Sequence, residues 1–144
     1  MLIQDRRGYS LTFWAVFIGL VLIPIFALSI ELGRYFYAIA EVQKAADAAA
    51  LAAAAEFDTQ VFQKSGDLVP NSRAWGIAQT YVNANTAALS AKGVRAFVSD
   101  IQIDSGADTV LVNVSADLSI LFPSVVPDVI VKQVGVAKLR AMTH

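Results

Sequence analysis

The sequence contains no cysteine, only one histidine, His144 at the last position, and few charged residues for its length. The absence of cysteine excludes disulfide bonds and thiolate metal sites. A single histidine at the last position does not provide a Ser-His-Asp set for hydrolysis. A net charge of -1 without a basic stripe argues against nucleic-acid binding, and no glycine-rich phosphate loop is present. We therefore expect a non-enzymatic protein with no cofactor and no small-molecule substrate.

One acidic group raises the question of a bound cation. Asp100, Asp104 and Asp108 lie in or beside the segment "SGAD" at 105–108. Carboxylates near a turn can bind Ca²⁺, but this spacing does not match an EF-hand loop. Carboxylates at turns and strand ends are usually solvated, so we expect no metal site.

Apolar residues are in excess. They make up 56% of the chain and charged residues 16%, against about 45–50% and about 25% in soluble domains. The excess is concentrated in residues 8–30 and in an alanine-rich block at 45–55. The length corresponds to about one domain.

The first apolar segment, residues 8–30, contains no charged residue. As a helix it would be about 34 Å long, enough to cross a hydrocarbon core of about 30 Å. A cleaved signal peptide has a shorter apolar core and a small-residue cleavage site, and no convincing site follows here. A soluble protein would need a much larger core to bury such a helix. We therefore expect a retained transmembrane helix over 9–31.

Aromatic residues lie near both ends of this segment, as in the aromatic belts of membrane helices. Packing of their rings against lipid or another helix explains them equally well. Pro24 lies inside the span and is expected to kink it, which membrane helices tolerate. We assign Tyr9, Phe13, Trp14, Pro24 and Ile30 to the span, with Tyr35 and Tyr37 at its far interface.

The orientation of the span follows from its flanking charges. Arg6 and Arg7 precede it, and Arg34 follows it. The positive-inside rule favours a cytoplasmic N-terminus, with residues 1–8 as a short cytoplasmic segment. A single span then places the folded part of the chain outside the cytoplasm, in the periplasm or beyond. We expect a bacterial cytoplasmic (inner) membrane protein whose first partner is the lipid bilayer.

Glu31 and Arg34 are the first charges after the span. At a spacing of three they can pair on one helix face. We expect the pair to be partly exposed, to contribute only tenths of a kcal/mol, and to mark the point where the helix leaves the lipid. No proline or glycine cluster follows until Gly66, so one helix is predicted to continue to Phe57, about 70 Å in all. Residues 32–57 form its extramembrane part.

The extramembrane part carries one apolar stripe at three-four spacing. Its many alanines allow another backbone to approach closely, as in small-residue helix seams. Two partners remain open for this face: a helix of another subunit or a second copy, or the chain's own C-terminal domain. The residues of this helix–helix seam are Tyr35, Ile39, Val42, Ala46, Ala49 and Ala53.

The remaining residues, 58–144, predict a small α+β domain. Gly66 and Pro70 indicate a loop at 58–71, and Asn71 or Ser72 would cap a helix at 72–90. Alternation of period two at 99–104, 109–119 and 129–141 predicts three strands, with a glycine-containing hairpin at 105–108 and a proline-containing loop at 122–128. The fold class is α+β: a long N-terminal transmembrane helix that continues outside the membrane, an antiparallel three-stranded sheet and one further helix.

The first fifty or so residues resemble the TadE/TadG-like proteins of tight-adherence (Flp-type) pilus systems. The resemblance rests on Arg6-Arg7-Gly8, Pro24, "ELGR" at 31–34 and "KAADAAALAAA" at 44–54, in that order. The segment 121–141 is loosely similar to the end of such domains. The resemblance implies a single-pass structural or assembly component of a pilus or secretion-type surface system. Its partners would be other membrane or pilus subunits, or copies of itself.

The resemblance also implies a prepilin-peptidase processing site between Gly8 and Tyr9. Prepilins of this class carry Glu five residues past the cut, where this chain has Phe13. This departure keeps a second hypothesis open. In it, the chain is a single-span accessory subunit of a larger respiratory or photosynthetic membrane complex, and its outer domain caps the other helices.

Overall fold

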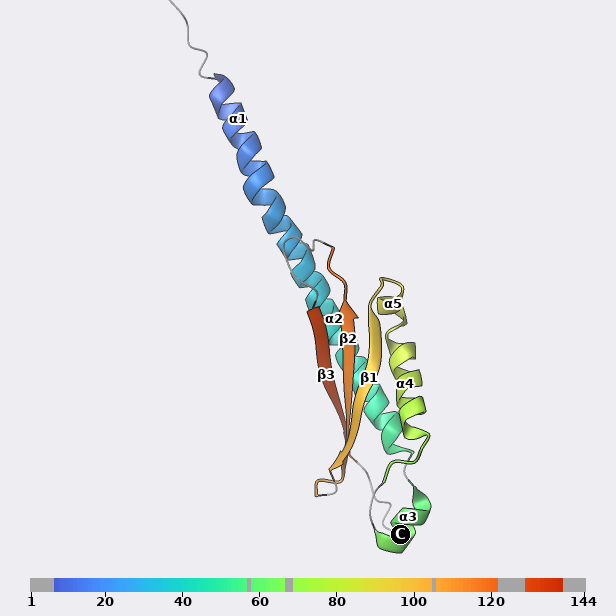
Figure 1. Cartoon of the computed structure of the whole chain (residues 1–144). Coiled ribbons are helices and arrows are strands. Elements are labelled where there is room, and N and C mark those ends of the chain that lie inside the picture. Colours follow the sequence, from blue (N-terminus) through green and yellow to red (C-terminus); the bar gives the residue numbers. More distant parts are fainter. Residues whose placement is uncertain (1–6, 57, 67–68, 105, 122–128, 139–144) are drawn as a thin grey trace, which may run out of the picture.

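The computed structural model describes residues 7–56, 58–66, 69–104, 106–121 and 129–138 (Figure 1). The N-terminal third is helical, with α1 (Arg7–Phe17), the π-helical segment η1 (Ile18–Leu22) and α2 (Ile23–Ala54). Three shorter helices follow, α3 (Thr59–Ser65), α4 (Ala74–Asn85) and α5 (Ala87–Ser90). The strands are β1 (Arg95–Asp104), β2 (Thr109–Leu118) and β3 (Val129–Lys138). The predicted α+β class is confirmed. The predicted loop at 122–128, residues 139–141 of the third predicted strand, and His144 lie outside the described residues.

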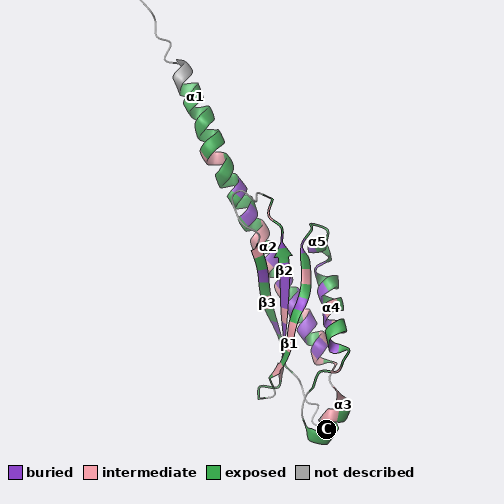
Figure 2. Cartoon of the chain, in the orientation of Figure 1, coloured by how far each residue is buried: buried purple, intermediate pink, exposed green. Residues whose placement is uncertain are grey.

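The segments α1, η1 and α2 run on from one another as one long helix, whose first part projects away from the domain (Figure 1). Figure 2 shows that this projecting part is almost entirely exposed, whereas the later part of α2 is buried along one side. Ala27 is the first buried residue among those whose exposure is described. The helix over Ser10–Ala54 is long and apolar enough to cross a membrane. It ends at Ala54 rather than at the predicted Phe57.

The π-helical segment η1 directly precedes Pro24. In an α-helix the amide of residue 24 would donate to the carbonyl of Leu20, but proline has no N–H and its ring crowds that carbonyl. In η1 the amide of Ile23 instead donates to the carbonyl of Ile18, five residues back. This wider turn accommodates the proline within a continuous helix.

The sheet is antiparallel with the order β1-β2-β3. Val112 of β2 lies between Ile101 of β1 and Gly135 of β3. A bulge between Val98 and Asp100 shifts the register of β1, so Val98 and Ile101 both face the core despite their odd spacing. At the predicted hairpin, the carboxylate of Asp104 accepts hydrogen bonds from the amides of Gly106 and Ala107 at 2.9 and 3.2 Å.

One face of the sheet is covered by helices: α2 packs on β2 and β3, and α4 packs on β1 and beside α2. Both edge strands also receive a glutamine side chain from these helices. The amide of Val98 in β1 donates to Oε1 of Gln79 at 2.8 Å, and Nε2 of Gln43 donates to the carbonyl of Val134 in β3 at 3.1 Å. These contacts satisfy edge groups that would otherwise be open to pairing with another strand.

Helix α2 and strand β3 approach each other at backbone distance. A Cβ built on Gly135 would lie 2.0 Å from the carbonyl oxygen of Ala46 and 2.7 Å from the amide nitrogen of Asp47. Glycine in the strand and alanine in the helix therefore bring the two backbones together, and any larger residue at position 135 has no room.

Other predicted boundaries also differ: the strand expected at 99–104 begins at Arg95, and the segments 58–71 and 72–90 were predicted wrongly. The segment 58–71, expected to be a loop, contains α3. Asp58 caps this helix by accepting hydrogen bonds from the amides of Gln60 and Val61 at 2.9 and 3.2 Å, and Gly66 follows it with a φ of 75°. The helix expected at 72–90 is interrupted at Thr86, whose buried hydroxyl donates to the carbonyl of Val82 at 2.8 Å.

Gly135→Ala tests the close contact of α2 with β3. We expect it to lower the free energy of unfolding by about 1–3 kcal/mol, because α2 has to move away from the sheet to admit the methyl group. Gly76→Ala in α4 is the matched control. Nothing lies within 4 Å of the methyl group that it adds, so stability should be unchanged or raised by up to about 1 kcal/mol. Urea unfolding of the full chain in detergent, followed by circular dichroism, measures both. Equal stability of the two variants would contradict the contact.

Candidate functional site

The residues assigned to the span lie on the projecting helix. Phe13, Trp14 and Ile30 are 65%, 56% and 52% exposed, and Pro24 is exposed as well. The rings of Phe13, Trp14 and Phe17 contact one another along the helix. Gly8 and Tyr9 are part of α1, but their side-chain environment lies outside the described residues. The projecting helix thus presents large apolar side chains that no described part of this chain covers.

The apolar stripe of α2 lies inside the domain. Val42, Ala46 and Ala49 are 0% exposed and Ala53 is 4% exposed. Tyr35 and Ile39 are half-buried and pack against the same core. Of the two partners left open for this face, the structure places the chain's own sheet and α4 against it.

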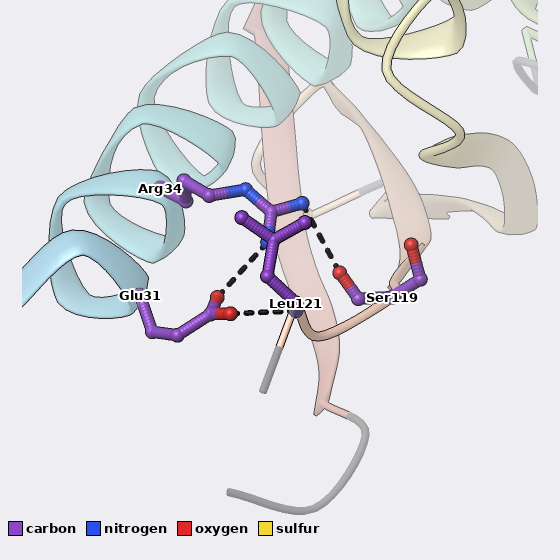
Figure 3. A network of polar contacts seen from close by, with 4 residues as sticks. All are labelled: Glu31, Arg34, Ser119 and Leu121. Atoms are coloured by element: carbon purple, nitrogen blue, oxygen red, sulfur yellow. Dashed lines mark hydrogen bonds and ion pairs between the residues drawn. The ribbon is translucent and has the colours of Figure 1, made fainter. Parts of the chain in front are cut away.

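A polar junction lies where the projecting helix meets the domain. It consists of Glu31 and Arg34 in α2 and of Ser119 and Leu121, which follow β2 (Figure 3). Nη1 of Arg34 donates to Oε2 of Glu31 at 3.0 Å, and Nη2 donates to the carbonyl of Ser119 at 3.1 Å. The amide of Leu121 donates to Oε1 of Glu31 at 2.6 Å. Two charged side chains therefore fasten the exit of β2 to the helix.

The expectation of a weak, partly exposed pair was wrong for Glu31. Its side chain is only 4% exposed, and that of Arg34 is 24% exposed. A buried carboxylate is costly unless charged or polar donors satisfy it, and here both oxygens accept hydrogen bonds. Loss of one partner would leave a buried charge or a buried amide unsatisfied, which costs more than the intact contact contributes.

A second pair on the same helix, Glu41 and Lys44, has the exposure that the sequence predicted for Glu31 and Arg34. Nζ of Lys44 lies 2.8 Å from Oε1 of Glu41 at the same spacing of three, but the Lys44 side chain is 67% exposed. The hydrogen bond from Lys44 to Glu41, and the charge of that carboxylate, raise the pKa of the lysine. The spacing of Glu and a cation is identical in both pairs, so the sequence alone does not distinguish the buried one.

An open apolar groove of about 270 Å³ adjoins the polar junction. Leu28, Leu32 and Tyr35 of α2 form one wall, and Leu118, Ile120 and Val129 form the other. Glu31 is the one charged residue in this lining. The groove was missed in the sequence because its two walls come from segments far apart in the chain.

Two of the three aspartates considered for metal binding have other partners. Asp104 caps the hairpin turn, and Asp100 accepts a hydrogen bond from Nε2 of Gln102 at 2.6 Å. Across the described ranges, no group of three or more His, Cys, Asp or Glu residues is placed to hold a metal ion. The absence of enzymatic activity stays a prediction.

Comparison with protein families matches residues 8–56 to the TadE/G-like Flp pilus-assembly family. The resemblance noted in the sequence is therefore confirmed over the long N-terminal helix and the two residues that follow it. Comparisons with curated proteins and with solved structures gave no match. The three-stranded domain lies outside the matched residues.

Glu31→Gln tests the polar junction. The side-chain amide of Gln has one oxygen and one NH₂ group. In either orientation, the NH₂ group faces another donor, Arg34 or the amide of Leu121. We expect this to cost about 1–3 kcal/mol locally and to speed amide exchange at Leu121. Hydrogen-exchange mass spectrometry on the full chain in lipid nanodiscs measures the rate. The control, Glu41→Gln, removes a pair of the same spacing and should change stability by less than about 0.5 kcal/mol. Unchanged protection at Leu121 in Glu31→Gln would show that the junction does not hold this segment.

Proposed function

We propose that the chain is a non-enzymatic, single-pass membrane protein and a structural or assembly component of a Flp-type pilus system in the bacterial cytoplasmic membrane. Residues 9–31 cross the membrane from a cytoplasmic N-terminus, and the domain lies on the outer side. The observation that carries this proposal is the coincidence of the family match, residues 8–56, with the helix that is long and apolar enough to span.

Exposure of the projecting helix supports the anchoring. Leu11, Leu20 and Phe26 are 76%, 75% and 64% exposed. Burial of one such side chain is worth about 1.5–3 kcal/mol, and exposed residues of this kind recur along the whole projecting part. Insertion into hydrocarbon removes that surface from water without any partner protein, and a helix satisfies its own backbone there.

The outer domain supports a role in binding other subunits rather than in chemistry. Its buried polar side chains are satisfied within the described ranges. The sheet face turned away from α2 carries exposed apolar residues, including Phe97, Ile130 and Val136. Apolar residues grouped on one face are typical of contacts between subunits. Other membrane or pilus subunits are the proposed partners.

One residue, Phe13, favours the hypothesis of an accessory subunit of a larger membrane complex. Within the family pattern the fifth residue after the Gly8–Tyr9 bond is Glu in prepilins, and here it is a phenylalanine that is 65% exposed. Phenylalanine has no charge to assist the docking of an N-terminus in a growing filament. We therefore place the chain among assembly components that keep their N-terminal segment, with the accessory subunit of another membrane complex as the alternative.

Topology is tested by labelling single cysteines, since the chain has none of its own. We expect Ala107→Cys, at the exposed hairpin tip, to react with a membrane-impermeant maleimide in intact spheroplasts. Gln4→Cys should react only after lysis. Both variants should stay in the pellet after alkaline carbonate extraction, because the span buries its apolar surface in lipid. Labelling in the reverse order would refute the orientation, and release by carbonate would refute the anchor.

Mass spectrometry after purification by a C-terminal tag separates the two functions. We expect subunits of a pilus or secretion system to co-purify and the chain to keep residues 1–8, with an intact mass near 15.4 kDa plus the tag. A mature chain that starts at Tyr9 would instead indicate a processed, pilin-like subunit. Co-purification of redox or pigment proteins would favour the accessory-subunit alternative.

A further inference from the structure

Among the described residues, the apolar groove beside the polar junction is open on one side, and the family match assigns it no role. It is bounded by Leu28 and Leu32 of the helix and by Leu118, Ile120 and Val129 of the strands. Its charged group, Glu31, accepts hydrogen bonds on both oxygens from Arg34 and Leu121. The groove therefore offers an occupant an apolar lining, and it does not require a charged or polar partner.

The position of the groove relative to the bilayer follows from the length of the projecting helix. Packing on the domain begins at Ala27, which is 7% exposed. The uncharged residues that project clear of the domain, 8–26, make a helix of about 28 Å. This is slightly less than the hydrocarbon thickness of about 30 Å, and tilting shortens it further. The uncharged turn at 27–30 therefore completes the span while it already lies beside the domain, and it brings Leu28 of the groove to the edge of the hydrocarbon.

Polar and aromatic residues further along α2 agree with this depth. Arg34 follows the groove residue Leu32, and Tyr37 lies about 14 Å beyond Leu28 along the helix axis. Nζ of Lys92 lies 4.8 Å from the centre of the Tyr37 ring. Tyrosine and long cationic side chains concentrate at the level of the lipid headgroups. Cationic and aromatic residues thus begin at the far end of the groove, where Tyr35 lines it next to Arg34, as they do at a bilayer surface.

We infer that the groove is filled by phospholipid acyl chains of the outer leaflet, so that the domain is seated in the membrane interface. The inference rests on the proposed function, because the span sets the depth. The occupant is lipid rather than a second protein because the groove continues the exposed apolar surface of the spanning helix. Leu121, which is 58% exposed beside the groove, extends that surface onto the domain.

Single-tryptophan variants of the full chain test the lipid contact. With Trp14→Phe and Trp75→Phe as the background, we place one tryptophan at the groove rim by Leu121→Trp. A second variant, Leu32→Trp, probes the groove wall in case the first perturbs the junction. Phe97→Trp, on the outer sheet face, is the matched control outside the groove, and Trp14 alone reports on the span. Each variant is reconstituted in phosphatidylcholine vesicles brominated near the headgroup end of the acyl chains.

Quenching of tryptophan emission by the brominated chains is the readout. We expect the probes at 121 and 32 to lose at least about half as much emission as Trp14, because the inferred acyl chains enter the groove from the edge of the hydrocarbon and contact both positions, and the probe at 97 to lose little. If Trp14 is quenched but positions 121 and 32 are not, the groove inference fails and the anchor stands. Quenching at 97 equal to that at 121 also overturns a contact specific to the groove. If Trp14 itself is not quenched, the proposed function fails first.

Discussion

The structure depends on a single helix whose two parts have different surroundings. A three-stranded sheet with one short helix has only a small core, and α2 supplies the layer that covers β2 and β3. The contact is possible because alanines on α2 face a glycine in β3, so the backbones meet at Ala46 and Gly135. The same helix, before Ala27, has large apolar residues on all sides instead. Side-chain size along one helix thus separates the part that packs on the sheet from the part that projects beyond the domain.

Continuity of this helix has a mechanical consequence for the domain. No flexible linker separates the projecting part from the part that packs on the sheet, since α2 runs from Ile23 to Ala54 without a break. Glu31 and Arg34 add a second attachment by holding the exit of β2 against the same helix. The domain therefore has little freedom to turn about the helix, and its outer face keeps a fixed direction relative to the membrane that we propose it stands on.

Sequence patterns predicted the elements well where one periodicity dominates. The uncharged run, the alanine stripe and the alternating strands all correspond to elements of the structure. The sequence did not predict the short helix α3, because Gly66 also indicates a loop. In the structure, Asp58 and Gly66 cap this helix at its two ends. The polar junction was not predictable, because Arg34 and Glu31 bind backbone groups of Ser119 and Leu121, 85 and 90 residues away. Any residue type can supply a backbone carbonyl or amide, so the residue types at 119 and 121 do not indicate these contacts.

The π turn at Ile18–Leu22 has a consequence for neighbours within the bilayer. A turn that closes over five residues rather than four inserts one residue into the winding, which rotates everything on one side of it by roughly 100° relative to the other. Side chains spaced by sevens across η1 therefore do not lie on a common face of the helix. A second helix lying along this one meets one set of residues before η1 and a differently rotated set after it. A heptad pattern assigned through η1 without this rotation would therefore place the wrong residues on the contact face.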